Sequence, residues 1–200
     1  MTGPGALGAE TTLVRAFVAL PCPGELRRSI AKGLAEWRDL AAGIAWTDPR
    51  KIHLTLRFLG DAHPDPLERL DEGLREVAGA TAPIEACAGA TGAFPGWGRP
   101  RVLWLGVESG GAVERLAGAV ESEARVAGFD AEGRPFTPHL TLGRVRSPRG
   151  VQRAVAAIRG WEVDPRPVRI EEMVLFRSRL GPGGARHDAL ATYRLDGLDP

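Results

Sequence analysis

The chain has 200 residues, of which 44% are hydrophobic and 26% charged, with a formal net charge of +1. This composition is typical of a globular protein and excludes a highly charged disordered chain, as well as the overall basic surface of a protein that wraps long nucleic acid. Two cysteines are too few for a disulfide framework or a cysteine-rich zinc site. No apolar run is long enough to span a membrane and no signal peptide is evident, so we expect a cytoplasmic protein with no membrane partner.

Strand and helix patterns alternate along the first half of the chain. The alternating segment 13–20 predicts a strand, and the apolar stripe of 25–39 predicts a helix. The segment 53–56 predicts the next strand, followed by a helix over 66–77 and a closing strand over 83–94. Glycine and proline residues lie between these elements, as they do between elements of regular structure in general.

The same order of elements returns in the second half. A strand is expected over 101–107, a helix over 112–127 and a strand over 139–142. A helix over 151–158 and a closing strand over 168–177 complete the unit. The Gly- and Arg-rich tail 177–188 reads as a surface loop, and 191–195 as a last short strand.

Both halves carry one identical tetrapeptide, 86 residues apart. It is His53-Leu54-Thr55-Leu56 in the first half and His139-Leu140-Thr141-Leu142 in the second, so two of the four histidines precede the same three residues. A repeat of this kind predicts duplicated structural units. We therefore expect an α+β fold with two pseudo-symmetric lobes around a central cleft, each lobe an antiparallel-rich sheet with helices on its outer face.

The Gly- and Pro-rich stretch 95–100 is the natural lobe boundary and is too short for a free linker. We expect one domain over residues 1–200, with lobe one at about 13–94, lobe two at about 101–195, and room for the termini to cross between the lobes.

The repeated tetrapeptide carries the candidate chemistry. Side chains alternate along a strand, so each His and Thr point one way and the two Leu the other. Two lobes would bring two imidazoles and two hydroxyls into one cleft. Histidine titrates near neutral pH, so such a pair can supply a general base and a general acid on opposite sides of a phosphorus atom. The threonine hydroxyls can donate hydrogen bonds to phosphoryl oxygens.

Two simpler interpretations compete with this one. The histidines could be packed structural residues, although a core does not require a polar His-Thr pair on one face. A metal site is disfavoured, because each strand offers one ligand with no carboxylate or thiol at ligand spacing.

The chain resembles the two-histidine (2H) phosphoesterase superfamily, whose hallmark is an HxTx motif repeated at about this distance. It is most similar to the RNA 2′,3′-cyclic phosphodiesterase branch, the LigT/ThpR-like proteins. The segments that carry this resemblance are 15–20, 53–60, 92–95, 101–107, 136–144 and 174–178.

The resemblance implies hydrolysis of an RNA 2′,3′-cyclic phosphate to a 2′-phosphomonoester, without metal or cofactor. It implies that His139 is the general base that activates water and His53 the general acid that protonates the leaving ribose oxygen. It further implies a set of residues that contact the substrate or lie near it: Thr55, Thr141, Arg144 and Phe17.

Other residues carry two interpretations each. Trp46 could stack on a base, or it could be a core or rim aromatic. Arg57 lies on the side of His53 and Thr55 by strand alternation, so it either contacts phosphate or is solvated. The 177–188 loop, which contains His187, either clamps an RNA end or has no function.

The substrate and the reaction each have alternatives. The expected substrate is an RNA with a 2′,3′-cyclic phosphate end or a small cyclic nucleotide, and we expect a monomer. The same cleft would also suit a 2′,5′-RNA ligase or a 2′,5′-oligonucleotide phosphodiesterase. A module that binds RNA ends without catalysis is the alternative outside enzymology, although binding does not require a matched acid and base.

Overall fold

The computed structural model describes residues 12–163, 166–181 and 184–197. The strands in these residues are β1 (Val14–Pro21), β2 (Ile44–Trp46), β3 (His53–Ala62), β4 (Ile84–Phe94), β5 (Val102–Glu108), β6 (His139–Val145), β7 (Val168–Ile170), β8 (Glu172–Gly181) and β9 (Gly184–Arg194). The helices are α1 (Gly24–Trp37), α2 (Pro64–Gly79), α3 (Ala112–Val126) and α4 (Val151–Arg159), with short 3₁₀ turns η1 (Arg38–Leu40) and η2 (Pro49–Lys51).

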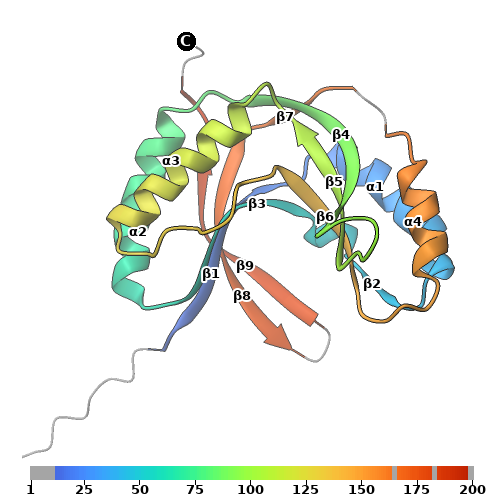
Figure 1. Cartoon of the computed structure of the whole chain (residues 1–200). Helices are drawn as coiled ribbons and strands as arrows, with labels where there is room; N and C mark the ends of the chain where they lie inside the picture. The colour runs from blue at the N-terminus through green and yellow to red at the C-terminus, as the bar shows by residue number, and fades with distance from the viewer. Residues whose placement is uncertain (1–11, 164–165, 182–183, 198–200) are drawn as a thin grey trace, which may run out of the picture.

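The strands of the described residues form one curled antiparallel sheet in the order β7-β4-β5-β6-β3-β1-β8-β9, with β2 beside β6. Helices α2 and α3 cover one half of the sheet, and α1 and α4 lie against the other (Figure 1). The mixed fold with two similar halves and helices outside confirms the predicted fold class. The predicted alternation of strands and helices is also confirmed as far as α4.

The C-terminal part of the chain differs from the prediction. The segment 177–188 is not a loop: its described residues belong to the β8–β9 hairpin, whose pairs run from Glu172 opposite Arg194 to Gly181 opposite Gly184. Cross-strand charge supports this hairpin, since the Arg179 guanidinium lies 2.5 Å from the Asp188 carboxylate. The strand expected over 168–177 is divided into β7 and β8, and the one over 191–195 is the end of β9. The many glycine and arginine residues of this segment hide, in the sequence, the alternation of side chains that would have predicted two paired strands.

The two halves of the sheet are not the two halves of the sequence. Strand β4 lies beside β5, whereas β8 and β9, from the end of the chain, lie beside β1. Each half of the chain therefore contributes strands to both halves of the sheet: β8 and β9 cross to the half that holds β1, as the prediction allowed for a terminus, and β4 crosses to the half that holds β5. The lobe bounds of about 13–94 and 101–195 stay a prediction. The order is nevertheless symmetric about the contact between β3 and β6, as a pseudo-two-fold axis requires.

That central contact is made by the repeated tetrapeptides. Leu54 of β3 is the antiparallel partner of Leu140 of β6. Both leucines are 2% exposed and belong to the continuous core under the helices. Because neighbouring residues of a strand point to opposite faces, the flanking His and Thr residues lie on the other, concave face of the sheet.

A β-bulge follows the motif in each half. In β3, Thr55 pairs with Ala19 but Arg57 pairs with Val18, so Leu56 is the extra residue. In β6 the register shifts in the same way between Thr141 and Gly143. A bulge turns every later side chain to the opposite face from the one that strict alternation gives. The residues after each motif are therefore oriented differently from the prediction.

We expect Leu140→Ala to lower the free energy of unfolding by about 2–5 kcal/mol, because it opens a cavity where the two halves meet. Urea unfolding at pH 7 measures this change. The matched control is Val126→Ala on α3, where the side chain is 79% exposed and the change should stay within about 0.5 kcal/mol. Equal unfolding midpoints for the two variants would contradict the central position of Leu140.

Candidate active site

The two motif histidines are held by the same backbone contact. Nδ1 of His53 lies 2.8 Å from the carbonyl oxygen of Lys51, and Nδ1 of His139 lies 2.7 Å from that of Thr137. A carbonyl only accepts, so each Nδ1 carries a proton and donates it. Each ring therefore has Nε2 left to accept or donate a proton, which is what a general base and a general acid need.

The threonines lie across from the histidines. The register that pairs Leu54 with Leu140 puts Thr141 opposite His53 and His139 opposite Thr55. Residues that face each other on antiparallel strands have Cβ atoms about 5 Å apart, and diagonal pairs such as the two histidines about 7–8 Å apart. The structure brings together the four residues that the motif predicts.

Aromatic rings support each imidazole. The Phe17 ring stacks on His53 with centroids 4.8 Å apart, and Phe176 stacks on Phe17 at 5.2 Å. On the other side of the cleft, Phe94 meets His139 edge-on at 5.1 Å, and Trp104 lies 6.1 Å away. Phe17 is thus the residue beneath His53, which agrees with its predicted place near the cleft.

Burial depresses the pKa of both imidazoles. The pKa of His53 falls from its usual 6.5 to about 4, chiefly because burial disfavours the charged ring; the Lys51 carbonyl opposes this, and His187, His139 and Arg144 add to it. The pKa of His139 is lowered by burial and by Arg144, against the Thr137 carbonyl. Both rings therefore favour the neutral form in the free protein.

A cleft of about 840 Å³ opens from this face toward α3. Thr55, His139, Thr141 and Arg144 line it, with Phe94 at the wall. By simple alternation Arg144 would point away from His139, but the bulge in β6 turns it into the cleft. Its positive charge lowers the pKa of both motif histidines.

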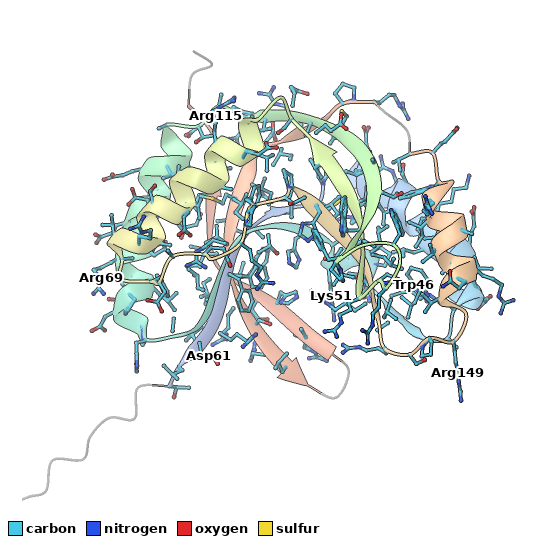
Figure 2. All side chains as sticks on the ribbon, in the orientation of Figure 1. Trp46, Lys51, Asp61, Arg69, Arg115 and Arg149 are labelled. Carbon is cyan, nitrogen blue, oxygen red and sulfur yellow. The ribbon has the colours of Figure 1, made fainter. Side chains whose placement is uncertain are left out.

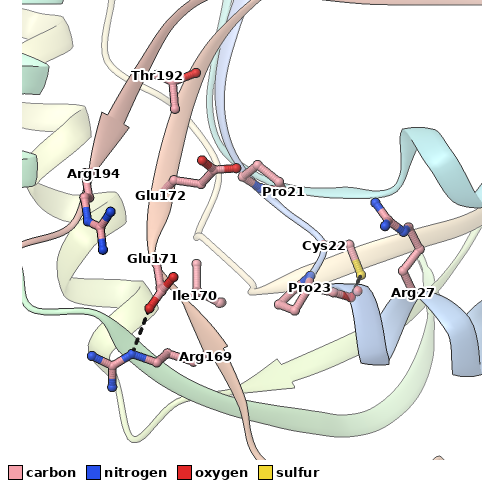
Figure 3. A pocket seen from close by; sticks show the side chains of 11 residues that line it. Pro21, Cys22, Pro23, Arg27, Arg169, Ile170, Glu171, Glu172, Thr192 and Arg194 are labelled. Carbon is pink, nitrogen blue, oxygen red and sulfur yellow. Dashed lines mark hydrogen bonds and ion pairs between the residues drawn. The ribbon is translucent and has the colours of Figure 1, made fainter.

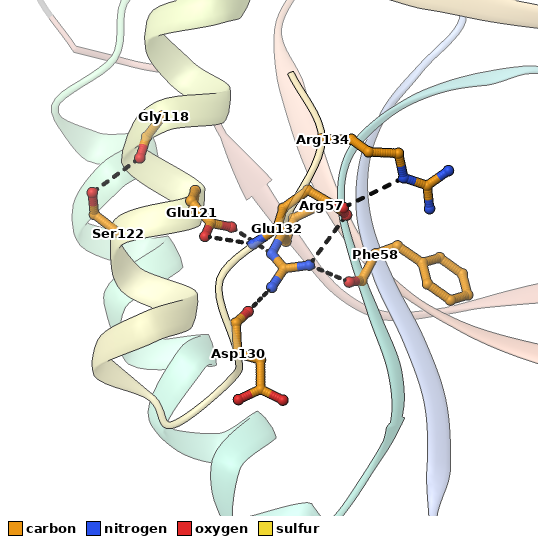
Figure 4. A network of polar contacts seen from close by, with 8 residues as sticks. All are labelled: Arg57, Phe58, Gly118, Glu121, Ser122, Asp130, Glu132 and Arg134. Atoms are coloured by element: carbon orange, nitrogen blue, oxygen red, sulfur yellow. Dashed lines mark hydrogen bonds and ion pairs between the residues drawn. The ribbon is translucent and has the colours of Figure 1, made fainter. Parts of the chain in front are cut away.

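Arg57 lines the same cleft, but not in the direction that strict strand alternation gives, and its contact with phosphate stays a prediction. The bulge at Leu56 turns it toward α3, where its Nε lies 2.5 Å from a Glu121 carboxylate oxygen (Figure 4). It also forms an ion pair with Glu132 at 3.6 Å and donates to the backbone carbonyls of Phe58 and Asp130. The guanidinium is 8% exposed and bound by protein partners, so it ties β3 to α3.

Trp46 is placed as a core aromatic. It lies on β2 next to Gly143 of β6, in the half of the sheet where α1 and α4 lie (Figure 2). Its ring meets that of Trp37 with centroids 6.2 Å apart. Its indole nitrogen is buried without a hydrogen-bond partner among the described residues. These contacts favour the interpretation as a core or rim residue over stacking on a base.

One histidine at the site was not assigned to it by sequence reasoning. His187 of β9 lies edge-on to His53, with ring centroids 5.3 Å apart. The sequence put this residue in a loop, and no motif surrounds it, so the only available signal was its residue type. His63, in contrast, is exposed before α2.

A second cavity, of about 530 Å³, lies between the end of β1, the start of α1 and strands β7 to β9 (Figure 3). Arginine side chains line it together with Glu171 and Glu172, and one of them, Arg169, is bound to Glu171 at 3.2 Å. Neither motif histidine lines this cavity, whereas His139 lines the larger cleft.

In the described part of the chain, no three His, Cys, Asp or Glu side chains gather as a metal ion would require. The expectation of metal-free chemistry thus stays a prediction that needs experiment. Among the same residues, no helix is long and apolar enough to cross a membrane.

We expect the depressed pKa of His53 to make the protein less stable in mild acid. Between about pH 6.5 and 4 the unfolded chain binds a proton that the folded ring refuses, so stability rises with pH across this window. His53→Gln should therefore lose less stability than the parent protein when urea unfolding is compared at pH 7 and pH 5. His63→Gln, at an exposed position, is the control, and an equal acid loss in all three proteins would contradict the assignment.

Residues 24–182 match the model of the 2′-5′ RNA ligase superfamily. The chain is 31% identical over 183 residues to the RNA 2′,3′-cyclic phosphodiesterase of Methanothermobacter thermautotrophicus, covering 91% of this chain and 99% of that protein. It is 32% identical over 197 residues to the RNA 2′,3′-cyclic phosphodiesterase of Thermus thermophilus, covering 92% and 91%.

Solved structures agree with these relatives. A crystal structure of a Thermus thermophilus protein superposes with a TM-score of 0.77 at 28% identity, covering 92% of this chain and all of that one. The crystal structure of E. coli LigT complexed with 3′-AMP gives a TM-score of 0.71 at 26% identity, covering 92% and 98%. The family match and the length of these alignments show that the chain belongs to the 2′-5′ RNA ligase superfamily.

Proposed function

We propose that this chain hydrolyses RNA 2′,3′-cyclic phosphate ends to 2′-phosphomonoesters, with two histidines as acid and base. The observation that carries this proposal is the antiparallel meeting of the two motifs, in which each His lies across from the Thr of the other motif. The names of the relatives, RNA 2′,3′-cyclic phosphodiesterases aligned over most of the chain, support the substrate class.

The cyclic phosphate lies between the two imidazoles in this proposal. The hydroxyls of Thr55 and Thr141 donate hydrogen bonds to its non-bridging oxygens. Arg144 adds a positive charge from one side of the cleft, which stabilises the charge that builds up on those oxygens in the transition state. The apolar wall of Phe17 and Phe94 strengthens these interactions by excluding water.

The chemical step uses the free Nε2 of each ring. Nε2 of His139 takes a proton from water as the water oxygen bonds to phosphorus. The bond from phosphorus to the ribose 3′ oxygen breaks, and Nε2 of His53 donates a proton to that oxygen, which leaves a 2′-phosphomonoester and a free 3′ hydroxyl. The roles of acid and base are taken from the resemblance, since the backbone contacts of the two rings are alike.

The low pKa of His53 bears on its role as acid. In the free protein burial keeps the ring neutral. An anionic phosphate a few ångströms away favours the protonated ring, so substrate binding is the event that charges His53. His53 is therefore protonated, and able to act as the acid, only when a phosphate occupies the cleft.

The alternatives predict other behaviour. A non-catalytic RNA-end binder needs donors for phosphate but not two rings whose Nδ1 protons are both fixed by carbonyls. Ligation or cleavage of 2′,5′ linkages uses the same residues and is separated from hydrolysis by a substrate panel ranked by kcat/KM. We further propose that the protein acts as a monomer in the cytoplasm, on RNA ends or on small cyclic nucleotides.

We expect His53→Asn and His139→Asn each to lower kcat/KM for a short RNA with a 2′,3′-cyclic phosphate by about 10²–10⁴-fold, the usual contribution of a general acid or base. The parent protein should show a bell-shaped pH profile in kcat/KM. His63→Asn is the control and should keep full activity. Near-normal turnover by folded His139→Asn would refute the mechanism.

We expect the two arginines after the motifs to behave in opposite ways. Arg144→Met should lower kcat/KM by about 10²-fold with little change in thermal unfolding, because it removes charge from the cleft. Arg57→Met should lower the free energy of unfolding by about 1–3 kcal/mol, because it removes the ion pairs to Glu121 and Glu132, and should leave kcat/KM within a few-fold. The reverse pattern would contradict the orientation that the bulges impose.

A further inference from the structure

The β8–β9 hairpin carries a third imidazole to the site. His187 lies on β9 opposite Ser178, on the same concave face as the motif histidines. Its ring meets Phe17 edge-on with centroids 5.0 Å apart and planes at 83°, and it meets His53 in the same way at 5.3 Å and 86°. Four strands, β1, β3, β8 and β9, therefore contribute the rings of Phe17, His53, Phe176 and His187 to a single cluster.

This cluster breaks the two-fold symmetry of the sheet. The position of β9 is taken in the other half by β7, which has three residues and pairs with the far end of β4. His139 has the rings of Phe94 and Trp104 near it, neither of which can take up a proton. In the described residues, His53 is thus the motif histidine with a titratable ring at its edge.

Lys51 holds the hairpin and His53 together. Its ammonium group donates to the carbonyl of Ala185, at 2.9 Å, two residues before His187. Its own carbonyl accepts the Nδ1 proton of His53. Lys51 therefore binds both His53 and the strand that carries His187, so a displacement of the β8–β9 hairpin would also displace the His53 ring.

The environment of His187 favours its neutral form. Its Nδ1 is buried and has no hydrogen-bond partner among the described residues. Burial and the Lys51 ammonium lower its pKa, while Asp188 opposes them. The Asp188 carboxylate is itself bound to Arg179 at 2.5 Å and to Arg177 at 3.8 Å.

We propose that His187 is a positioning residue for the acid: its ring holds the His53 imidazole against Phe17, and a proton on either ring disfavours a proton on the other. The groups that face His53 with a charge or a titratable proton are His139 and Arg144 of β6 and His187 of β9, whereas β1 and β8 offer the uncharged Phe17 and Phe176. This inference rests on the proposed role of His53 and adds the device that keeps its ring in place.

Two substitutions separate the two parts of this role. His187→Phe keeps an aromatic edge on Phe17 and His53 but cannot be charged, and His187→Gln removes both the ring and the charge. His63→Gln, outside the site, is the matched control. The first measurement is the titration of the His53 ring in the free protein, followed by ¹H–¹³C NMR and assigned with His53→Asn. Thermal unfolding confirms that each variant is folded.

We expect the pKa of His53 to rise by about half a unit or more in both His187 variants, because a like charge is removed. With a cyclic-phosphate RNA, His187→Phe should keep kcat/KM within about threefold and His187→Gln should lose about tenfold, since only the second removes the ring contact. The limb of the pH profile that follows His53 should move with the NMR titration. A His53 titration unchanged in both variants would overturn the inference.

The outcomes also separate this inference from the proposed function. If the parent protein does not hydrolyse the RNA but the His53 titration shifts as expected, the coupling of the two rings stands and the proposed reaction falls. If the parent protein hydrolyses the RNA while equal activity losses in the two variants accompany an unshifted titration, His187 has only a structural role and the inference falls.

Discussion

Strands β3 and β6 meet in antiparallel orientation at Leu54 and Leu140, and most of the architecture depends on this contact. The two leucines join the cores of both halves of the sheet. The same pairing directs two histidines and two threonines to the concave face, each across from its counterpart. A tetrapeptide that occurs twice thereby makes a site with an imidazole at either side. Stability and chemistry are thus set by opposite faces of the same eight residues.

Symmetry of the backbone is broken by the side chains after the motifs. The bulge that follows each motif brings the fifth residue after the histidine to the cleft, and this residue is Phe58 in one half and Arg144 in the other. Phe58 stacks on Phe17, whereas Arg144 places a positive charge near the histidines. His187 adds a further difference on the Phe58 side. The two imidazoles therefore share a hydrogen-bonding pattern but differ in their electrostatic surroundings, as an acid and a base must.

Much of this site could be predicted because alternation along a strand is a local property. His53, Thr55 and their repeats were identified from the duplicated tetrapeptide, and the outer helices from their apolar stripes. The direction of the Arg57 side chain differs from strict alternation because a bulge depends on the partner strand, and nothing in the motif itself shows where the register will shift. His187 was missed for a related reason: its contact with His53 exists only after the hairpin has folded back over β1. Pairing between strands that are distant in the sequence also explains why each half of the sheet contains strands from both halves of the chain.

The central claim is that the two histidines act as acid and base on a cyclic phosphate. The most direct measurement follows a short RNA ending in a 2′,3′-cyclic phosphate by phosphorus NMR, with the purified protein and excess EDTA. We expect the cyclic resonance to convert to that of a 2′-phosphomonoester, since the proposed acid protonates the 3′ oxygen. A 3′-phosphomonoester would contradict the assigned leaving oxygen while keeping the pair of histidines. A cyclic resonance that shifts on binding but never converts would contradict the claim itself.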